Sequence, residues 1–194
     1  MRKVGILGGI FDPVHIGHLH IGDGVCRKLG LEKLLLVPSG DPPHKKDSPV
    51  ASGEHRLRML KNAVADNSLF EITDIELKRR GKSYTADTLK QLRQENPDWE
   101  PYFIIGGDNL TEIPTWKTPE KIFMLAKVVV VNRPGYDAGT ESSQLPGEAI
   151  NITLPGINLS STDIRGYIRG GISCRYLLPP GVEDYIIKHK LYTR

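Results

Sequence analysis

Two histidines near the start of the chain, His15 and His18, stand three residues apart in the segment GGIFDPVHIGH. At the start of a helix this spacing brings both rings to one face, where they can point toward the same group. Gly8 and Gly9 come before them, at the end of a short apolar run. Their backbone N–H groups can approach a ligand closely, and the positive end of the following helix favours an anion. A phosphate fits this arrangement, although a glycine pair alone also makes an ordinary strand-to-helix turn.

A metal site is the alternative for the same histidines, because His20 follows close behind them. We expect His20 to fall on a different face of the helix and to be structural. Asp12 precedes the helix and Asp23 faces elsewhere, so no carboxylate or cysteine stands at ligand spacing nearby. We therefore expect no protein ligands to a metal.

Late in the chain, the segment LSSTDIR carries hydroxyl groups and a cation. Ser161 and Thr162 are expected to cap a helix whose first N–H groups can hold phosphates. Arg165 lies one turn further and offers a planar set of donors to the same oxygens. An ordinary helix cap explains the two hydroxyls, but it does not explain the arginine at that spacing.

Short apolar strands that alternate with helices must position these residues. The expected strands are residues 4–7, 34–37, 70–75, 102–105, 128–131 and 151–154, and the expected helices are residues 18–29, 54–65, 85–95, 119–124, 161–169 and 181–190. Strands that are apolar on both faces indicate a parallel sheet covered on both sides. We predict an α/β fold, a Rossmann-like doubly wound parallel sheet with helices on both faces, as a single domain over residues 1–194.

Composition limits the possible partners. The formal net charge is only +3, and the densest basic cluster covers residues 78–82, so we expect no nucleic-acid partner. The apolar runs are too short to span a bilayer, and the first one is broken too soon for a signal peptide. The two cysteines, Cys26 and Cys174, form no CxxC pair and suit a reducing compartment. We expect a cytoplasmic protein without a membrane partner, and a homo-oligomer stays open.

Five segments resemble known sequences in the correct order. The opening segment is similar to the (T/H)xGH signature of the nucleotidyltransferase superfamily, and LSSTDIR resembles the ISSTxxR signature of its adenylyltransferases, with Leu159 in place of the usual isoleucine. PSGDPPHKK (38–46), GKSYTADTL (81–89) and FIIGGDNLTEIPTWKTPEKI (103–122) resemble segments of the bacterial nicotinate-nucleotide adenylyltransferases. Together with the closing DYIIKHKLY, the resemblance covers essentially the whole chain.

The resemblance implies a reaction in NAD biosynthesis, in which the adenylyl group of ATP passes to nicotinate mononucleotide with release of pyrophosphate. The attacking phosphate oxygen is already ionised at neutral pH, so neither a general base nor a covalent enzyme intermediate is needed. We expect donors at the α-phosphate to do the catalysis, and assign this role to His15, His18, Lys45 and Arg165. Mg²⁺ is expected to be held mainly by the phosphates of ATP.

The expected ATP-binding residues lie at the strand ends and at the late helix: Gly8, Gly9, Ile10, Phe11, Gly106, Asp108, Ser161 and Thr162. Asp108 follows a glycine turn at a strand end, where a carboxylate can accept two hydroxyl hydrogen bonds. The resemblance implies that it binds the ribose of the adenylate, and a helix N-cap is the alternative.

The expected mononucleotide-binding residues are His44, Tyr84, Thr85, Trp116, Lys117 and Arg133. Trp116 offers a flat apolar face, and the resemblance implies that the pyridine ring stacks on it; the alternative is a tryptophan packed on the edge of the core. Tyr84 and Thr85 open a helix whose N–H groups can receive a carboxylate, which favours nicotinate over nicotinamide. Lys117 stands where family members often carry an aromatic residue, and its charge can strengthen this preference.

Two of the basic residues in these sets carry weaker arguments. His44 and Lys45 lie in a proline-rich loop and can reach the mononucleotide phosphate, but Lys45 can also be an ordinary surface charge. The rival functions are a pantetheine-phosphate adenylyltransferase, which would lack the three middle segments, and a nucleotide-binding sensor without catalysis.

Overall fold

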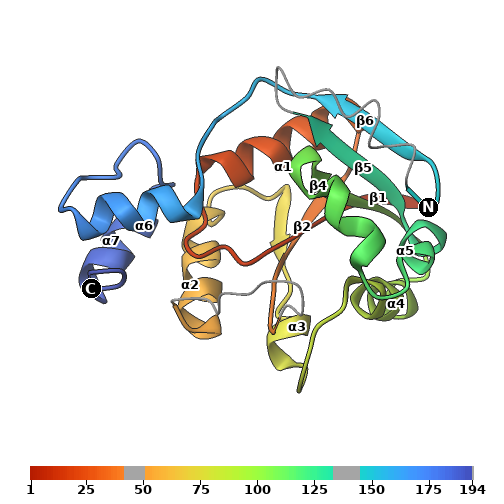
Figure 1. The fold of residues 1–194 in the computed structure, drawn as a ribbon, viewed down its shortest axis with the longest axis horizontal. Helices are drawn as coiled ribbons and strands as arrows, with labels where there is room; N and C mark the ends of the chain where they lie inside the picture. The colour runs from red at the N-terminus through yellow and green to blue at the C-terminus, as the bar shows by residue number, and fades with distance from the viewer. Residues whose placement is uncertain (42–50, 133–144, 194) are drawn as a thin grey trace.

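Six parallel strands form the centre of the molecule in the order β3-β2-β1-β4-β5-β6 (Figure 1). The computed structural model describes residues 1–41, 51–132 and 145–193, apart from the side chains of residues 108, 109 and 111. Within these residues the strands are β1 (Arg2–Gly9), β2 (Lys33–Pro38), β3 (Phe70–Ile72), β4 (Trp99–Gly106), β5 (Lys127–Asn132) and β6 (Ala149–Thr153). The order reverses beside β1, which pairs with β2 on one side and with β4 on the other. Doubly wound sheets bind ligands at such a reversal, beyond the carboxyl ends of the strands.

Helices follow most of the strands and cover both faces of the sheet. They are α1 (Ile16–Leu29), α2 (Gly53–Ala63), α3 (Ile75–Lys78), α4 (Thr85–Glu95), the 3-10 helix η1 (Gly107–Thr115), α5 (Pro119–Leu125), α6 (Ser161–Arg169) and α7 (Val182–Lys188). α6 and α7 lie together beside α2, at the end of the molecule opposite the N-terminus (Figure 1).

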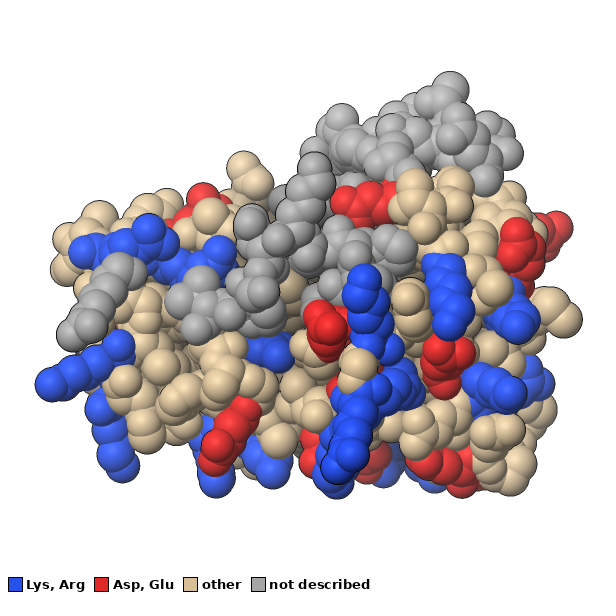
Figure 2. All heavy atoms as spheres, turned by 60° about the horizontal axis from the view of Figure 1, so that its bottom comes forward, with Lys and Arg blue, Asp and Glu red and all other residues tan. Residues whose placement is uncertain are grey.

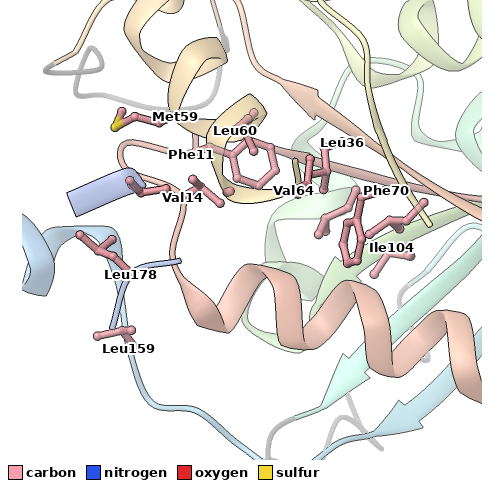
Figure 3. Packing of buried hydrophobic residues seen from close by; sticks show 14 of the residues in the cluster. Phe11, Val14, Leu36, Met59, Leu60, Val64, Phe70, Ile104, Leu159 and Leu178 are labelled. Atoms are coloured by element: carbon pink, nitrogen blue, oxygen red, sulfur yellow. The ribbon is translucent and has the colours of Figure 1, made fainter. Parts of the chain in front are cut away.

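The alternation of side chains along β5 shows how the two faces are filled. Val129 and Val131 pack with side chains of α1, α2, α6 and α7, whereas Val128 and Val130 pack with side chains of α4, η1 and α5. Figure 3 shows part of the first cluster, in which side chains from β2, α2 and the segment after β1 come together. The doubly wound parallel sheet with helices on both faces is therefore confirmed.

Helix α1 approaches the sheet closely because glycines face it. A Cβ atom on Gly22 would overlap the side chain of Leu34, and a Cβ atom on Gly24 would lie 2.7 Å from Leu154. This close approach fixes the position of the helix start, which carries the two histidines.

Local structure departs from the prediction at several element ends. The strand expected over residues 70–75 ends at Ile72, because Thr73 turns the chain into α3: its hydroxyl oxygen accepts a hydrogen bond from the N–H of Ile75 (3.4 Å). Residues 107–115, for which no helix was expected, form η1. β4 begins at Trp99 rather than at residue 102, because Arg2 and Trp99 extend the pairing of β1 with β4.

The surface carries both signs of charge. On the face drawn in Figure 2, Lys and Arg side chains are interspersed with Asp and Glu side chains. None of the helices in the described part of the chain is long and apolar enough to cross a membrane.

Candidate active site

The segment after β1 brings His15 and His18 into contact. His15 is the N-cap of α1, and the ring centroids of the two histidines are 3.8 Å apart. The Nδ1 atom of His18 accepts a hydrogen bond from the backbone N–H of His15 (3.2 Å). Because Nδ1 is an acceptor, the neutral ring of His18 carries its proton on Nε2, where it can be donated. Helix α1 begins two residues earlier than predicted, at Ile16, so that both histidines belong to its first turn.

Gly8 is an exposed position in the sheet, although it lies in the central strand β1 and pairs with the buried Val37. A Cβ atom on Gly8 would meet no other atom within 4 Å. Space for a ligand therefore adjoins the backbone at the carboxyl end of β1.

Two other glycines make room for the rings of this segment. A Cβ atom on Gly9 would lie 3.1 Å from the ring of Phe11, and one on Gly17 would lie 3.0 Å from Nδ1 of His15. The side chain of Phe11 is only 1% exposed, with its ring 5.0 Å from that of His18. Of the predicted ATP contacts, Phe11 can thus reach a nucleotide only through its backbone.

Helix α6 contacts the loop between β1 and α1 (residues 10–15), which we call the first loop, although the two segments lie far apart in the sequence. The hydroxyl of Ser161 donates to the carbonyl of Pro13 (2.9 Å), and Nη1 of Arg165 donates to the carbonyl of Asp12 (2.7 Å). Nη2 of Arg165 also donates to the hydroxyl oxygen of Thr162 (3.1 Å). The two motifs are far apart in the sequence, yet they adjoin in space.

The cap of α6 differs from the prediction, because Ser160 takes this position instead of Ser161 or Thr162. The hydroxyl oxygen of Ser160 accepts from the N–H of Asp163 (3.1 Å), and the Asp163 carboxylate accepts from the N–H of Ser160 (2.9 Å). Hydrogen bonds from Ser160 lower the pKa of Asp163, and the nearby His15 acts in the same direction. Because Ser160 caps the helix, the hydroxyl of Ser161 is available to hold the first loop.

Gly106 borders a small hollow beyond the ends of β4 and β5. Gly17 and His20 of α1 line it on one side, and Asn132 lines it on another. Nε2 of His20 lies 2.8 Å from the carbonyl of Pro155, so the ring attaches α1 to the segment after β6.

The start of α4 gathers several residues predicted to bind the mononucleotide. Tyr84 is the N-cap of this helix, and its carbonyl accepts from the N–H groups of Asp87 (3.0 Å) and Thr88 (3.1 Å). The N–H groups of Thr85 and Ala86 come before these bonds in the first turn, where a helix offers no carbonyl of its own to accept them. Nζ of Lys117 lies 4.1 Å from the centre of the Tyr84 ring and 3.8 Å from the Asp87 carboxylate. Lys117 therefore adds a positive charge at the start of α4.

Trp116 packs on the edge of the core, as one of its two alternatives expected, and stacking of a ligand ring on it stays a prediction. Its ring packs edge-on against Phe103, with centroids 6.2 Å apart, at the border of the core. The residue is still only half-buried, so part of its surface faces outward.

Four of the predicted groups are outside the described residues: His44, Lys45, Arg133 and the side chain of Asp108. Within the part that is described, no group of three or more His, Cys, Asp or Glu side chains lies close enough to hold a metal ion.

Comparison with known proteins decides the family. A cytidylyltransferase-like family model matches residues 6–167. The probable nicotinate-nucleotide adenylyltransferase of Symbiobacterium thermophilum is 41% identical over 201 residues, which cover 100% of this chain and 97% of the relative. That of Enterococcus faecalis is 46% identical over 191 residues, covering 98% and 85%. The chain belongs to the nicotinate-nucleotide adenylyltransferase family.

The fold also matches a solved structure of an adenylyltransferase. Plasmodium falciparum nicotinic acid mononucleotide adenylyltransferase complexed with NaAD has a TM-score of 0.81 and 22% identity, over 99% of this chain and 98% of that one. Membership of the nicotinate-nucleotide adenylyltransferase family confirms the resemblance expected from the five ordered segments.

Three residues near the first loop were not predicted as part of the site: Asp12, Arg56 and Tyr192. Arg56 is 2% exposed, and its Nη1 donates to the carbonyl of Ile10 (2.7 Å). Burial lowers the pKa of Arg56, and the neighbouring Asp12 opposes this shift. A sequence signal exists for Arg56, since it shares the helical spacing of the buried Leu60 and Ala63. Tyr192 is the last residue of the closing segment DYIIKHKLY, but its position in that segment does not indicate a contact with Asp12.

Proposed function

We propose that this chain transfers the adenylyl group of ATP to nicotinate mononucleotide. A phosphate oxygen of the mononucleotide attacks the α-phosphorus of ATP, the bond from this phosphorus to the bridging oxygen breaks, and pyrophosphate leaves with nicotinate adenine dinucleotide as the other product. One observation carries the proposal: Ser161 and Arg165 of α6 hydrogen-bond to the loop that holds His15 and His18. A triphosphate at the exposed Gly8 would adjoin both motifs.

The catalytic work proposed for the protein is to bring two anions together and to stabilise the charge that develops between them. His18 donates through Nε2 to the α-phosphate, and His15 lies against it. Arg165 holds the first loop through Nη1 and donates to Thr162 of its own helix through Nη2, and its guanidinium has further N–H groups for phosphate oxygens. Lys45 is proposed as an additional cation.

ATP is proposed to lie along the strand ends. Its phosphates face the backbone of Gly8, Gly9, Ile10 and Phe11 and the first turn of α6 with Ser161 and Thr162. Its ribose lies near Gly106 and Asp108. Mg²⁺ is proposed to enter with ATP and to be held mainly by its phosphates, since this ion keeps several waters and takes few protein ligands.

Nicotinate mononucleotide is proposed to lie at the start of α4, with its ring on Trp116 and its carboxylate at the amides opened by Tyr84 and Thr85. Lys117 is proposed to favour the acid over the amide through its charge, part of which is offset by the Asp87 carboxylate at 3.8 Å. His44 and Arg133 are proposed to bind its phosphate.

The proposed compartment is a reducing one such as the cytoplasm, which is supported by the two cysteines, both of them buried free thiols. A homo-oligomer remains part of the proposal.

A pyrophosphate-release assay tests this function. ATP is offered with nicotinate mononucleotide, nicotinamide mononucleotide or phosphopantetheine in parallel. We expect the highest kcat/KM with nicotinate mononucleotide. Faster turnover of phosphopantetheine would identify the rival enzyme, and no release with any acceptor would indicate a nucleotide-binding protein without catalysis.

A further inference from the structure

The loop between β1 and α1 is held in place by side chains from distant parts of the chain. The carbonyl of Ile10 accepts from Arg56 of α2 (2.7 Å), and the carbonyl of Asp12 accepts from Arg165 of α6 (2.7 Å). Within the loop, Phe11 has a φ of 52°, a left-handed conformation that L side chains rarely adopt. Such a conformation persists where its surroundings over-determine it, so these bonds define the path of the loop.

Asp12 has the central place in this arrangement. Its residue is 3% exposed, and its Oδ1 atom accepts from the N–H of Ala51 (3.1 Å) and from the hydroxyl of Tyr192 (2.7 Å). The main chain of Asp12 holds α6 through Arg165, while its side chain holds Ala51, just before α2, and Tyr192, near the end of the described chain. A shift of Asp12 would therefore move the segment that ends at His15, three residues later.

Tyr192 is buried where it contacts Asp12. It is 6% exposed, its hydroxyl lies 4.0 Å from the sulfur of Met59, and it has a φ of 63°. Burial raises the pKa of Tyr192, and the hydrogen bond to Asp12 acts in the same direction. A raised pKa favours the protonated phenol, the form in which its hydroxyl donates to the Asp12 carboxylate.

We propose that Tyr192 is a positioning residue for adenylyl transfer, which acts through Asp12 on the loop that places His15 and His18. This inference rests on the proposed function, because the two histidines are the donors whose position matters. The hydroxyl of Tyr192 does not touch substrate in this account. The hydroxyl holds the Asp12 carboxylate in place, and Asp12 in turn holds the first loop in place.

The test is the variant Tyr192→Phe, which removes only the hydroxyl. We expect kcat to fall by ~10-fold or more, because small displacements of a group that acts in the transition state are costly. The KM values for ATP and for the mononucleotide should stay within about two-fold, since the donors act on developing charge rather than on the bound substrates. All kinetics are measured well below the melting temperature of each variant.

Two matched variants control for the loss of a tyrosine hydroxyl. Tyr185→Phe removes the bond from α7 to His55 of α2 (3.0 Å), and Tyr102→Phe removes a hydroxyl on β4 that accepts from Nζ of Lys127 (3.4 Å). Both should keep the wild-type kcat. If Tyr192→Phe loses stability but keeps the kcat of these controls, its role is only structural and the inference is wrong.

A double variant tests the route through Asp12. Asp12→Ala and Tyr192→Phe each remove the hydrogen bond between these two side chains, so their effects on kcat should not add: the double variant should be no slower than the slower single variant. Fully multiplicative losses would show that Tyr192 acts by another route.

A measurement without catalysis separates this inference from the proposed function. In Tyr192→Phe, the NMR resonances of the His15 and His18 rings should shift, and in Tyr185→Phe they should not. If the wild-type protein released no pyrophosphate, the proposed function would fail while the ring resonances still tested the link from Tyr192. Unchanged ring resonances in Tyr192→Phe overturn the link.

Discussion

The side chain of His18 is oriented by one backbone hydrogen bond, from the N–H of His15 to Nδ1. This bond orients the ring and selects its neutral tautomer, which carries the proton on Nε2. A residue that is oriented in this way costs little reorganisation when charge develops nearby. The spacing of the two histidines therefore has a consequence beyond their shared face, because the first orients the second.

Replacement of His18 tests its proposed role as a donor. His18→Ala is expected to lower kcat by ~10²–10³-fold, the scale of one lost donor to a developing charge. His18→Asn keeps an acceptor for the N–H of His15 but has no Nε2 donor, so it should lose kcat equally and keep the wild-type melting temperature. His189→Ala, an exposed histidine after α7, should keep the wild-type kcat. Near-normal turnover in a folded His18→Ala protein would remove His18 from the reaction.

Trp116 is the residue expected to control the affinity for the mononucleotide. Trp116→Ala should raise the KM for nicotinate mononucleotide by ~10-fold, if ring stacking contributes about 1.5 kcal/mol. The KM for ATP should not change, and Trp116→Phe should give an intermediate value. Trp99, half-buried at the start of β4, provides the control Trp99→Phe. An equal loss of ATP affinity would show that the indole does not belong to the mononucleotide site.

Among the elements, α3 attaches the segment after β2 to α4. Glu76 of α3 is buried, and its Oε1 accepts from the hydroxyl of Thr88 of α4 (2.7 Å). Nη1 of Arg79 donates to the same hydroxyl oxygen (2.9 Å). A Cβ atom on Gly40 would overlap the backbone of Glu76, so the two segments are in close contact. This four-residue helix thus supports the start of α4, where the mononucleotide is proposed to bind.

The burial of Glu76 has a consequence for stability that depends on pH. Burial raises the pKa of Glu76 above its usual value near 4.5, although the bond from Thr88 and the charge of Arg79 oppose this shift. The folded state therefore keeps the proton to higher pH than the unfolded state does. Below the unfolded pKa this contribution to stability is fully present, and it is lost as pH rises through the folded pKa.

The variant Glu76→Gln removes this titration and keeps an acceptor for Thr88. Its free energy of unfolding relative to the wild type is expected to increase as pH rises above 4.5 and then to level off. Urea unfolding at a series of pH values measures the difference. Glu148→Gln, at an exposed position, should show no such trend. A difference for Glu76→Gln that is flat across the series contradicts the assignment.

For the whole molecule, local sequence patterns predict the sheet and miss the contacts between its loops. Val128 to Val131 are readable as a buried strand because both faces of the sheet are covered. The cap at Ser160 was also readable, since Ser160 and Asp163 have the spacing of a capping box. The hydrogen bond from Ser161 to Pro13 could not be predicted from the sequence, because it joins segments that only the complete fold brings together.

The same distinction applies to the candidate site. Glycines and histidines at the end of β1 indicate a phosphate site because their chemistry is local. The roles of Arg56 and Tyr192 depend on where α2 and the end of the chain lie in space. Spacing indicates that Arg56 is buried and the resemblance includes the segment of Tyr192, but neither indicates a contact with the first loop, which forms only in the complete fold.

The convergence of the first loop and α6 predicts that one ligand stabilises both. ATP with Mg²⁺, without an acceptor, should slow amide hydrogen exchange in residues 8–18 and in residues 160–165 together. At a ligand concentration of about 100 times Kd, binding to the folded state alone suppresses opening by ~100-fold. Helix α5, on the other face of the sheet and away from this contact, should change much less. Protection confined to residues 8–18 would mean that α6 does not share the triphosphate, because a ligand held by both segments must restrain the opening of both.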